Sequence, residues 1–194
     1  MVMKNKLSTL PVLLLLSSFL HAQWELGFGP GIGIPITGYQ QVLKSGWLLN
    51  GEGKCRFKKG NFAVGLKAHF ARLQNDKNPA DSFQNARMTI APILIIVEYR
   101  IPVKGKLEPY VSGGLGVSLF SFNYDTSPTA GKTLFNVSFT MAPVVGVNYN
   151  ATKNIYPFVE WGLVLLTDGP PVGFPKADKM TGYHSIIAGL KYRF

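Results

Sequence analysis

The chain has 194 residues, of which 46% are hydrophobic, and it carries 21 glycines, 13 phenylalanines and a formal net charge of +10. This length corresponds to one domain. Beyond the N-terminus no stretch is rich in helix-forming residues, and none is apolar over the roughly 20 residues that a membrane-spanning helix needs, which excludes a helical membrane protein.

The N-terminus has the layout of a secretory signal peptide. Basic residues precede an apolar run of about 14 residues, too short to cross a bilayer as a helix, and Ala22 offers a small residue for cleavage. We expect cleavage near Ala22, with Leu20 standing where a smaller residue is usual. The chain is thereby divided into a signal peptide, 1–22, and an exported domain, 23–194.

Export argues against nucleic acid as the partner of the basic charge. Cys55 is the only cysteine, so no intramolecular disulfide can form.

Alternation of apolar and polar residues with a period of two recurs along the exported domain and predicts β-strands. The predicted strands span residues 24–36, 46–57, 61–73, 88–100, 108–121, 134–149, 155–167 and 183–194. Each has about 12 to 16 residues, more than most strands of soluble sheets and enough to cross a bilayer when tilted. Their even number is typical of single-chain bacterial barrels. The expected fold is all-β: an eight-stranded antiparallel up-and-down transmembrane β-barrel.

The predicted connections alternate in length. Short turns fall at 58–60, 101–107 and 150–154, and longer loops at 37–45, 74–87, 122–133 and 168–182. Transmembrane barrels have short periplasmic turns and long external loops. Basic residues gather near the short turns, which fits either contact with anionic lipid headgroups or solubilising turn chemistry. Pro92 and Pro143 lie inside predicted strands, so we expect bulges or shifted strand limits there.

The two faces of each strand predict what lies inside the barrel. A β-structure in lipid must close on itself with its apolar face outward, so the polar face looks into the lumen. An eight-stranded barrel is only wide enough for side chains to fill that lumen. The predicted polar network of the lumen consists of Glu25, Glu52, Lys54, Arg56, Lys67, Glu98, Arg100, Glu160, Lys191 and Arg193. Asn50 and His69 are also expected to point inward, and His69 has no second His or Cys at metal-binding spacing.

Three features resemble the small outer-membrane barrels of the OmpA/OmpX-like superfamily. They are the signal peptide, the strand start Pro109-Tyr110-Val111, repeated as Pro157-Phe158-Val159, and the terminal sequence GLKYRF. The resemblance covers the exported domain and implies location in the outer membrane, among outer-membrane lipids. Tyr192 and Phe194 resemble the assembly signal that such proteins present to the barrel-assembly machinery.

Signals for catalysis, cofactors and metals are weak. The glycine-rich stretch 27–33 lies in a strand and does not open a helix, so a phosphate-binding loop is rejected. Some barrels of this size modify lipid A with His and Ser near the external rim, where this chain has His184 and Ser185, with Asp168 or Asp178 in the preceding loop. Adjacent residues of a strand point to opposite faces, so the first two should not meet. The sequence indicates no cofactor and no catalytic site.

The expected function is therefore a structural role, or an interaction through loops 74–87, 122–133 and 168–182 with an unknown partner. The main alternative is a narrow porin-like channel, which requires a continuous water path past the charges of the lumen. A lipid A-modifying enzyme and a soluble periplasmic lipid carrier are less favoured functions.

Overall fold

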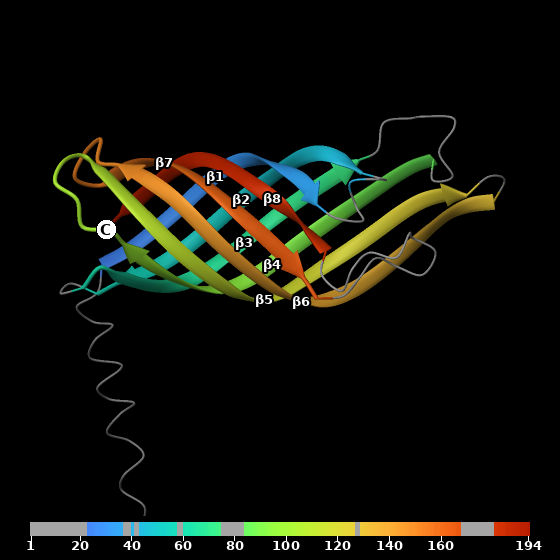
Figure 1. Cartoon of the computed structure of the whole chain (residues 1–194), viewed down its shortest axis with the longest axis horizontal. Coiled ribbons are helices and arrows are strands. Elements are labelled where there is room, and N and C mark those ends of the chain that lie inside the picture. The colour runs from blue at the N-terminus through green and yellow to red at the C-terminus, as the bar shows by residue number, and fades with distance from the viewer. Residues whose placement is uncertain are drawn as a thin grey trace, which may run out of the picture.

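The computed structural model describes residues 23–36, 40, 43–57, 60–74, 84–126, 129–167 and 181–194, and at 84–85, 124–126 and 129–134 the description covers the backbone alone. The strands are β1 (Gln23–Ile36), β2 (Lys44–Arg56), β3 (Phe62–Gln74), β4 (Gln84–Arg100), β5 (Leu107–Thr126), β6 (Thr129–Tyr149), β7 (Ile155–Leu166) and β8 (Thr181–Arg193). Each pairs antiparallel with its neighbours in sequence, and β8 pairs with β1, which closes the barrel (Figure 1). The predicted eight-stranded up-and-down barrel is confirmed.

The two ends of the barrel differ in what they connect. The turn end joins β2 to β3, β4 to β5 and β6 to β7, and the loop end carries the other four connections. The C-terminus lies at the turn end, at the left of Figure 1. There the Phe194 N–H donates to the Trp24 carbonyl at 2.9 Å, and Glu25 is the Cα partner of Arg193. The last strand thus completes the sheet beside the first.

One predicted loop is wrong. The sequence predicts a loop over 122–133, but β5 continues to Thr126 and β6 begins at Thr129, with Asn123 and Thr133 as Cα partners. The polar composition of this stretch is typical of a loop. A two-stranded hairpin pairs its backbone groups internally, however, and has no need of an apolar face to do so.

The other predicted loops keep their place but shrink. The strands leave residues 37–43 of the predicted loop 37–45, residues 75–83 of the predicted loop 74–87, and residues 168–180 of the predicted loop 168–182. Apart from Gln40 and Leu43, these residues lie outside the described ones, as does the predicted signal peptide 1–22.

The prolines inside the strands cause neither bulges nor shifted limits, so that prediction is wrong. Pro92 keeps Ser118 of β5 as its Cα partner, and the ladder to β3 is interrupted beside it without a change of register. Pro143 likewise pairs with Gly113 of β5, and the β7 ladder skips it with the register unchanged. A proline lacks only its own N–H, so the strand loses hydrogen bonds on one side but keeps its alignment.

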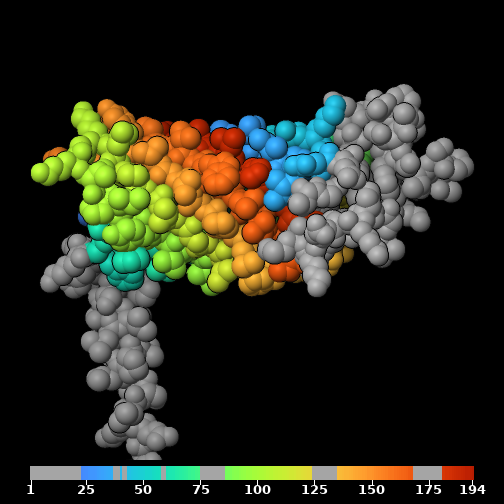
Figure 2. All heavy atoms as spheres, viewed as in Figure 1, coloured from blue at the N-terminus to red at the C-terminus, as the bar shows by residue number. Residues whose placement is uncertain are grey.

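The exterior of the barrel is apolar. Large hydrophobic side chains stand exposed along the strands, among them Phe28 at 61%, Leu66 at 60% and Ile95 at 63%. Figure 2 shows part of this surface as a continuous wall of side chains. A water-soluble barrel would turn these residues inward, whereas lipid favours them outside. Within the described ranges, no helix is long and apolar enough to cross a membrane.

The interior has two zones, where the sequence predicts a polar interior throughout. The half toward the turn end is charged. The half toward the loop end is an apolar zone that includes Leu43, Leu48, Leu73, Met88, Ile90, Phe120, Phe122, Leu166, Tyr183 and Ile187, each at most 4% exposed. Strand β4 illustrates the cause, because inward Met88 lies between outward Arg87 and Thr89. The polar residues of that stretch face outward and the apolar ones inward, the reverse of the expected pattern.

Candidate functional site

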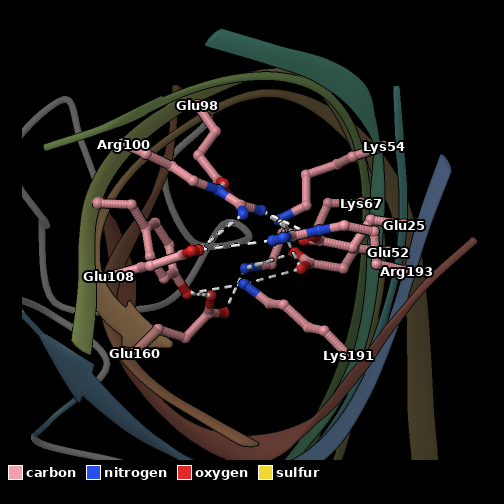
Figure 3. Close-up of polar contacts among 11 residues, drawn as sticks. Glu25, Glu52, Lys54, Lys67, Glu98, Arg100, Glu108, Glu160, Lys191 and Arg193 are labelled. Atoms are coloured by element: carbon pink, nitrogen blue, oxygen red, sulfur yellow. Dashed lines mark hydrogen bonds and ion pairs between the residues drawn. The ribbon is translucent and has the colours of Figure 1, made fainter. Parts of the chain in front are cut away.

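The charged half of the interior is the candidate functional site. Side chains from seven of the eight strands converge there (Figure 3). We call this group the lumen cluster, and its members are Glu25, Glu52, Lys54, Lys67, Glu98, Arg100, Glu108, Tyr110, Glu160, Lys191 and Arg193. Apart from Glu108 and Arg193 at its outer edge, every member is buried.

The layer nearest the turn end is organised by Arg100. Its guanidinium donates to both carboxylate oxygens of Glu25, at 2.8 and 2.6 Å, and through Nε to Glu98 at 2.8 Å. The same side chain reaches Glu108 at 3.0 Å. Arg193 joins from β8, 3.2 Å from Glu25 and 3.4 Å from Glu108. One arginine therefore holds β4 to β1 across the lumen and to its neighbour β5, with the fork geometry that suits carboxylates.

The deeper layer contains the three lysines. Lys54 lies 2.8 Å from Glu52 and also pairs with Glu98. Lys191 lies 3.2 Å from Glu52, and its ammonium sits 4.2 Å from the ring centre of Tyr110, within the range of a cation–π contact. Lys67 pairs with Glu160. Each lysine is therefore matched to at least one carboxylate.

One ion pair of the deeper layer crosses the whole lumen. Lys67 of β3 pairs with Glu160 of β7, and in the closed order of eight strands these two strands are diametrically opposite. The Tyr110 hydroxyl donates to the other oxygen of Glu160 at 2.8 Å. A side-chain bridge between opposite walls leaves no open axis at this level.

The charges of the lumen cluster balance. Five carboxylates, Glu25, Glu52, Glu98, Glu108 and Glu160, face five cations, Lys54, Lys67, Arg100, Lys191 and Arg193. Buried charges carry a large desolvation cost that only close partners offset. Removing one partner of such a pair typically destabilises a protein by about 3–5 kcal/mol, because an uncompensated buried charge remains.

Two glycines make room for the cluster. A Cβ at Gly27 would lie 2.8 Å from Cγ of Glu52, and one at Gly146 would lie 2.5 Å from the Tyr110 hydroxyl. Both distances are far below a normal carbon contact. Side chains at these positions would displace Glu52 and Tyr110 from the partners described above.

The structure brings together every residue of the predicted network except Arg56. That side chain is half-buried in β2 and forms no ion pair with any described residue. Sequence reasoning missed Glu108 and Tyr110. Both lie on the face of β5 opposite apolar Val111, Leu115 and Val117, so the alternation of the strand did carry the signal.

Other predicted residues take separate places. Asn50 and His69 are Cα partners at the boundary of the two interior zones, both buried. His184 is half-buried and stacks on outward-facing Trp161 with ring centres 5.5 Å apart, whereas Ser185 is buried inside the barrel. This His–Ser pair therefore points to opposite faces, as the sequence predicts. Asp168 and Asp178, the carboxylates proposed beside it, lie outside the described residues.

Aromatic pairs mark the outer surface near both ends. Tyr192 and Phe194 meet edge to face at 4.9 Å between ring centres, at the turn end, and both are exposed. Trp47 and Phe70 lie 5.6 Å apart near the loop end. Aromatic side chains concentrate where a membrane meets water, so the two ends are placed at the two interfaces.

Solved structures of low sequence identity share this fold. The Neisserial surface protein A matches with a TM-score of 0.57 and 15% identity, covering 89% of this chain and 97% of its own. Ail of Yersinia pestis, the attachment invasion locus protein, matches with a TM-score of 0.57 and 13% identity, covering 90% of this chain and 99% of its own. A major outer membrane protein of Thermus thermophilus matches with a TM-score of 0.58 and 14% identity, covering 89% of this chain and 99% of its own. At such identities the likeness establishes the fold alone.

Comparison with known sequences and families adds the assignment. The sequence matches none of the curated proteins. The family model described as "Outer membrane protein beta-barrel domain" matches residues 8–194, nearly the whole chain. Together with the closed barrel and its apolar exterior, this match establishes that the chain belongs to the outer membrane protein beta-barrel domain family and is a protein of the outer membrane.

Proposed function

We propose that this chain is an outer-membrane barrel with a sealed interior, which serves a structural role or an interaction through its loops and does not conduct solutes. The observation that carries the proposal is the filling of the lumen at two successive levels. Neither level depends on the other, because one is built from ion pairs and the other from apolar side chains.

The lumen cluster supports the seal toward the turn end. The Lys67–Glu160 pair joins opposite walls, and Arg100 ties Glu25 to the other side of the lumen. An ion entering this space would have to separate buried ion pairs. Each charge would then lose the partner that offsets its desolvation cost. A porin lumen, in contrast, leaves an aqueous channel between its charged walls.

The apolar zone supports the seal toward the loop end. Leu73, Phe122 and Tyr183 are fully buried there. A constriction lined by apolar side chains blocks ions even without complete steric closure, because it does not hold water. A porin-like channel would therefore require both the lumen cluster and the apolar zone to rearrange.

The proposed interaction through the loops follows from the sealed interior, because only the outer surfaces of such a barrel can bind a partner. A barrel that does not conduct offers its surfaces, and Ail, which shares the fold, is described as an attachment invasion locus protein and has been solved with the heparin analogue sucrose octasulfate. The longer connections of this chain lie at the loop end, so we expect an extracellular partner to bind there. The outer-membrane lipids and the barrel-assembly machinery are the other partners that we propose.

Planar-bilayer recording tests the sealed interior. We expect no stepwise current from the folded protein, with a porin inserted under the same conditions as the positive control. Heat-modifiable gel mobility of the same sample shows that the barrel is folded. Regular current steps from folded protein would overturn the proposal in favour of the channel.

A lipid A-modifying activity is tested separately. Because His184 and Ser185 lie on opposite sides of the barrel wall, we expect no change in acyl content when the protein is incubated with labelled lipid A. Loss or gain of an acyl chain would show that catalytic residues lie elsewhere in the chain.

A further inference from the structure

The apolar exterior is interrupted near the loop end by a polar patch on β3, β4 and β5. Arg72 of β3 follows outward-facing Phe70 by two residues and so points outward too, and Arg87 of β4 is exposed. Asn123 of β5 is the Cα partner of Arg87. Two cations and an amide thus lie together on a surface that is otherwise built for lipid.

The two arginines are close neighbours. Arg72 is the Cα partner of Thr89, and Arg87 precedes Thr89 by two residues on the same face of β4. This is a diagonal pair of an antiparallel ladder, in which the residues lie about 7–8 Å apart. Two guanidinium groups on side chains of this length are able to converge on one anion.

Nothing within the described residues neutralises this pair. Neither Arg72 nor Arg87 forms an ion pair with a described carboxylate, and the Nε of Arg72 is buried without a hydrogen-bond partner. Like charges side by side repel one another, and a cation at the edge of a membrane is stabilised by an anion of the headgroup layer. Within the part of the chain that the structure describes, the patch therefore has no anionic partner.

A groove runs from the patch toward the middle of the membrane. It encloses about 520 Å³ on the outer surface of β4, β5 and β6, with Thr89, Ala91 and Ser121 as its small residues and Leu119, Val137 and Phe135 as larger ones. Along β4 the order Arg87, Thr89, Ala91 leads away from the loop end. The apolar hollow thus begins next to the two cations, because Thr89 at its edge is the Cα partner of Arg72 and lies two residues from Arg87.

The position along the barrel fits a lipid headgroup. Arg72 is the Cα partner of Trp47, whose ring packs on Phe70. Tryptophan is enriched at the headgroup level of membranes. Because short turns of such barrels are periplasmic, the loop end lies in the outer leaflet, whose phosphorylated lipid is lipid A.

We propose that Arg72 and Arg87 bind a phosphate of lipid A while one of its acyl chains lies in the groove of Ala91, Leu119 and Phe135. The arginine fork suits phosphate oxygens, and the groove accepts a hydrocarbon chain. The inference depends on the placement of the barrel in the membrane and not on whether its interior conducts.

Binding of lipid A to the folded full chain in neutral detergent, measured by native mass spectrometry, tests the site. The double variant R72Q/R87Q should bind bisphosphorylated lipid A at least tenfold more weakly than the wild type, because two charge-assisted contacts are lost. The matched control K104Q/K106Q removes the same charge from the exposed turn at the opposite barrel end and should bind as the wild type does. Equal weakening in both variants, or in neither, overturns the site.

Three further measurements separate the parts of the proposal. Dephosphorylated lipid A should bind the wild type as weakly as the double variant binds the intact lipid, and equal affinity for both lipids would refute phosphate recognition. The variant A91W keeps both arginines and fills the groove, so it should also weaken binding, and unchanged affinity would remove the acyl chain from the site. Phosphatidylglycerol binding as tightly as lipid A would overturn the assignment to lipid A. Gel mobility before and after heating confirms that each variant is folded.

Discussion

Replacing Glu160 by leucine probes the lumen cluster at the bridge between opposite walls. Glu160 is 2% exposed, pairs with Lys67 and accepts a hydrogen bond from Tyr110. In the variant, Glu52, at 3.7 Å, is the only described carboxylate that still pairs with Lys67. Loss of one member of a buried pair typically lowers the free energy of unfolding by about 3–5 kcal/mol. Because Lys67 keeps its contact to Glu52, we expect a loss at the lower end of this range, about 3 kcal/mol. The unfolding equilibrium constant should therefore rise more than about 100-fold.

A double-mutant cycle isolates the ion pair from the other effects of substitution. The variant K67M/E160L removes both charges together, and buried pairs replaced by apolar residues are often neutral or stabilising. We expect the double variant to be more stable than E160L by about 2 kcal/mol or more. Urea titration of the protein in lipid vesicles, followed by gel mobility and tryptophan fluorescence, measures each free energy of unfolding.

The exposed substitution K104M, which removes a positive charge from the turn after β4, is the control and should change stability by no more than about 0.5 kcal/mol. The single variant K67M completes the cycle. If E160L falls within that margin of the wild type, or if the losses of stability in K67M and E160L simply add in the double variant, the bridge does not hold the walls together.

The remaining predictions concern the barrel wall, the apolar zone and the C-terminus. Gly27→Val should lower the free energy of unfolding by about 1–3 kcal/mol, because its side chain collides with Glu52, whereas Gly53→Val on the outer face should not. Leu73→Ala should cost about 2–5 kcal/mol in the same urea titration, against little change for exposed Gln74→Ala. Deletion of Phe194 should lower the amount of folded barrel in the outer membrane while export continues, measured by cell fractionation; normal membrane levels would contradict an assembly role.

The fold was predictable because alternation and strand length are local properties of the sequence. Strands such as β8, with Ile186, Leu190 and Tyr192 on one face, carry the period of two without ambiguity. The ends of β5 and β6 were not predictable in this way. Their pairing beyond the barrel wall depends on the partner strand, and composition alone gives no sign of it.

The site was predictable in membership but not in connectivity. Parity assigns each charge to the lumen, because every strand has only two faces. Which charges meet depends on the stagger of strands around the barrel. Glu160 reaches Lys67, four strands away, and Arg56 reaches no described partner although its parity suits the network. The apolar zone also escaped prediction. Inward Leu73 lies between outward Arg72 and Gln74, so apolar side chains point inward and polar ones outward there, the reverse of the pattern elsewhere in the barrel.

Strand β8 joins the requirements of assembly and of stability in one segment. Its outward residues Tyr192 and Phe194 are the proposed signal for insertion, while inward Lys191 and Arg193 belong to the lumen cluster. Arg193 pairs with Glu25, its Cα partner on β1, so an ion pair lies directly on the seam where the barrel closes. Ion pairs between strands that are distant in the chain, such as Arg193–Glu25 and Lys67–Glu160, can form only when the sheet has curled into a barrel. The barrel must therefore close in the same step in which its buried charges are paired. A barrel with an open seam and unpaired charges at this end would be unstable, so we expect this end to be either fully closed or unfolded.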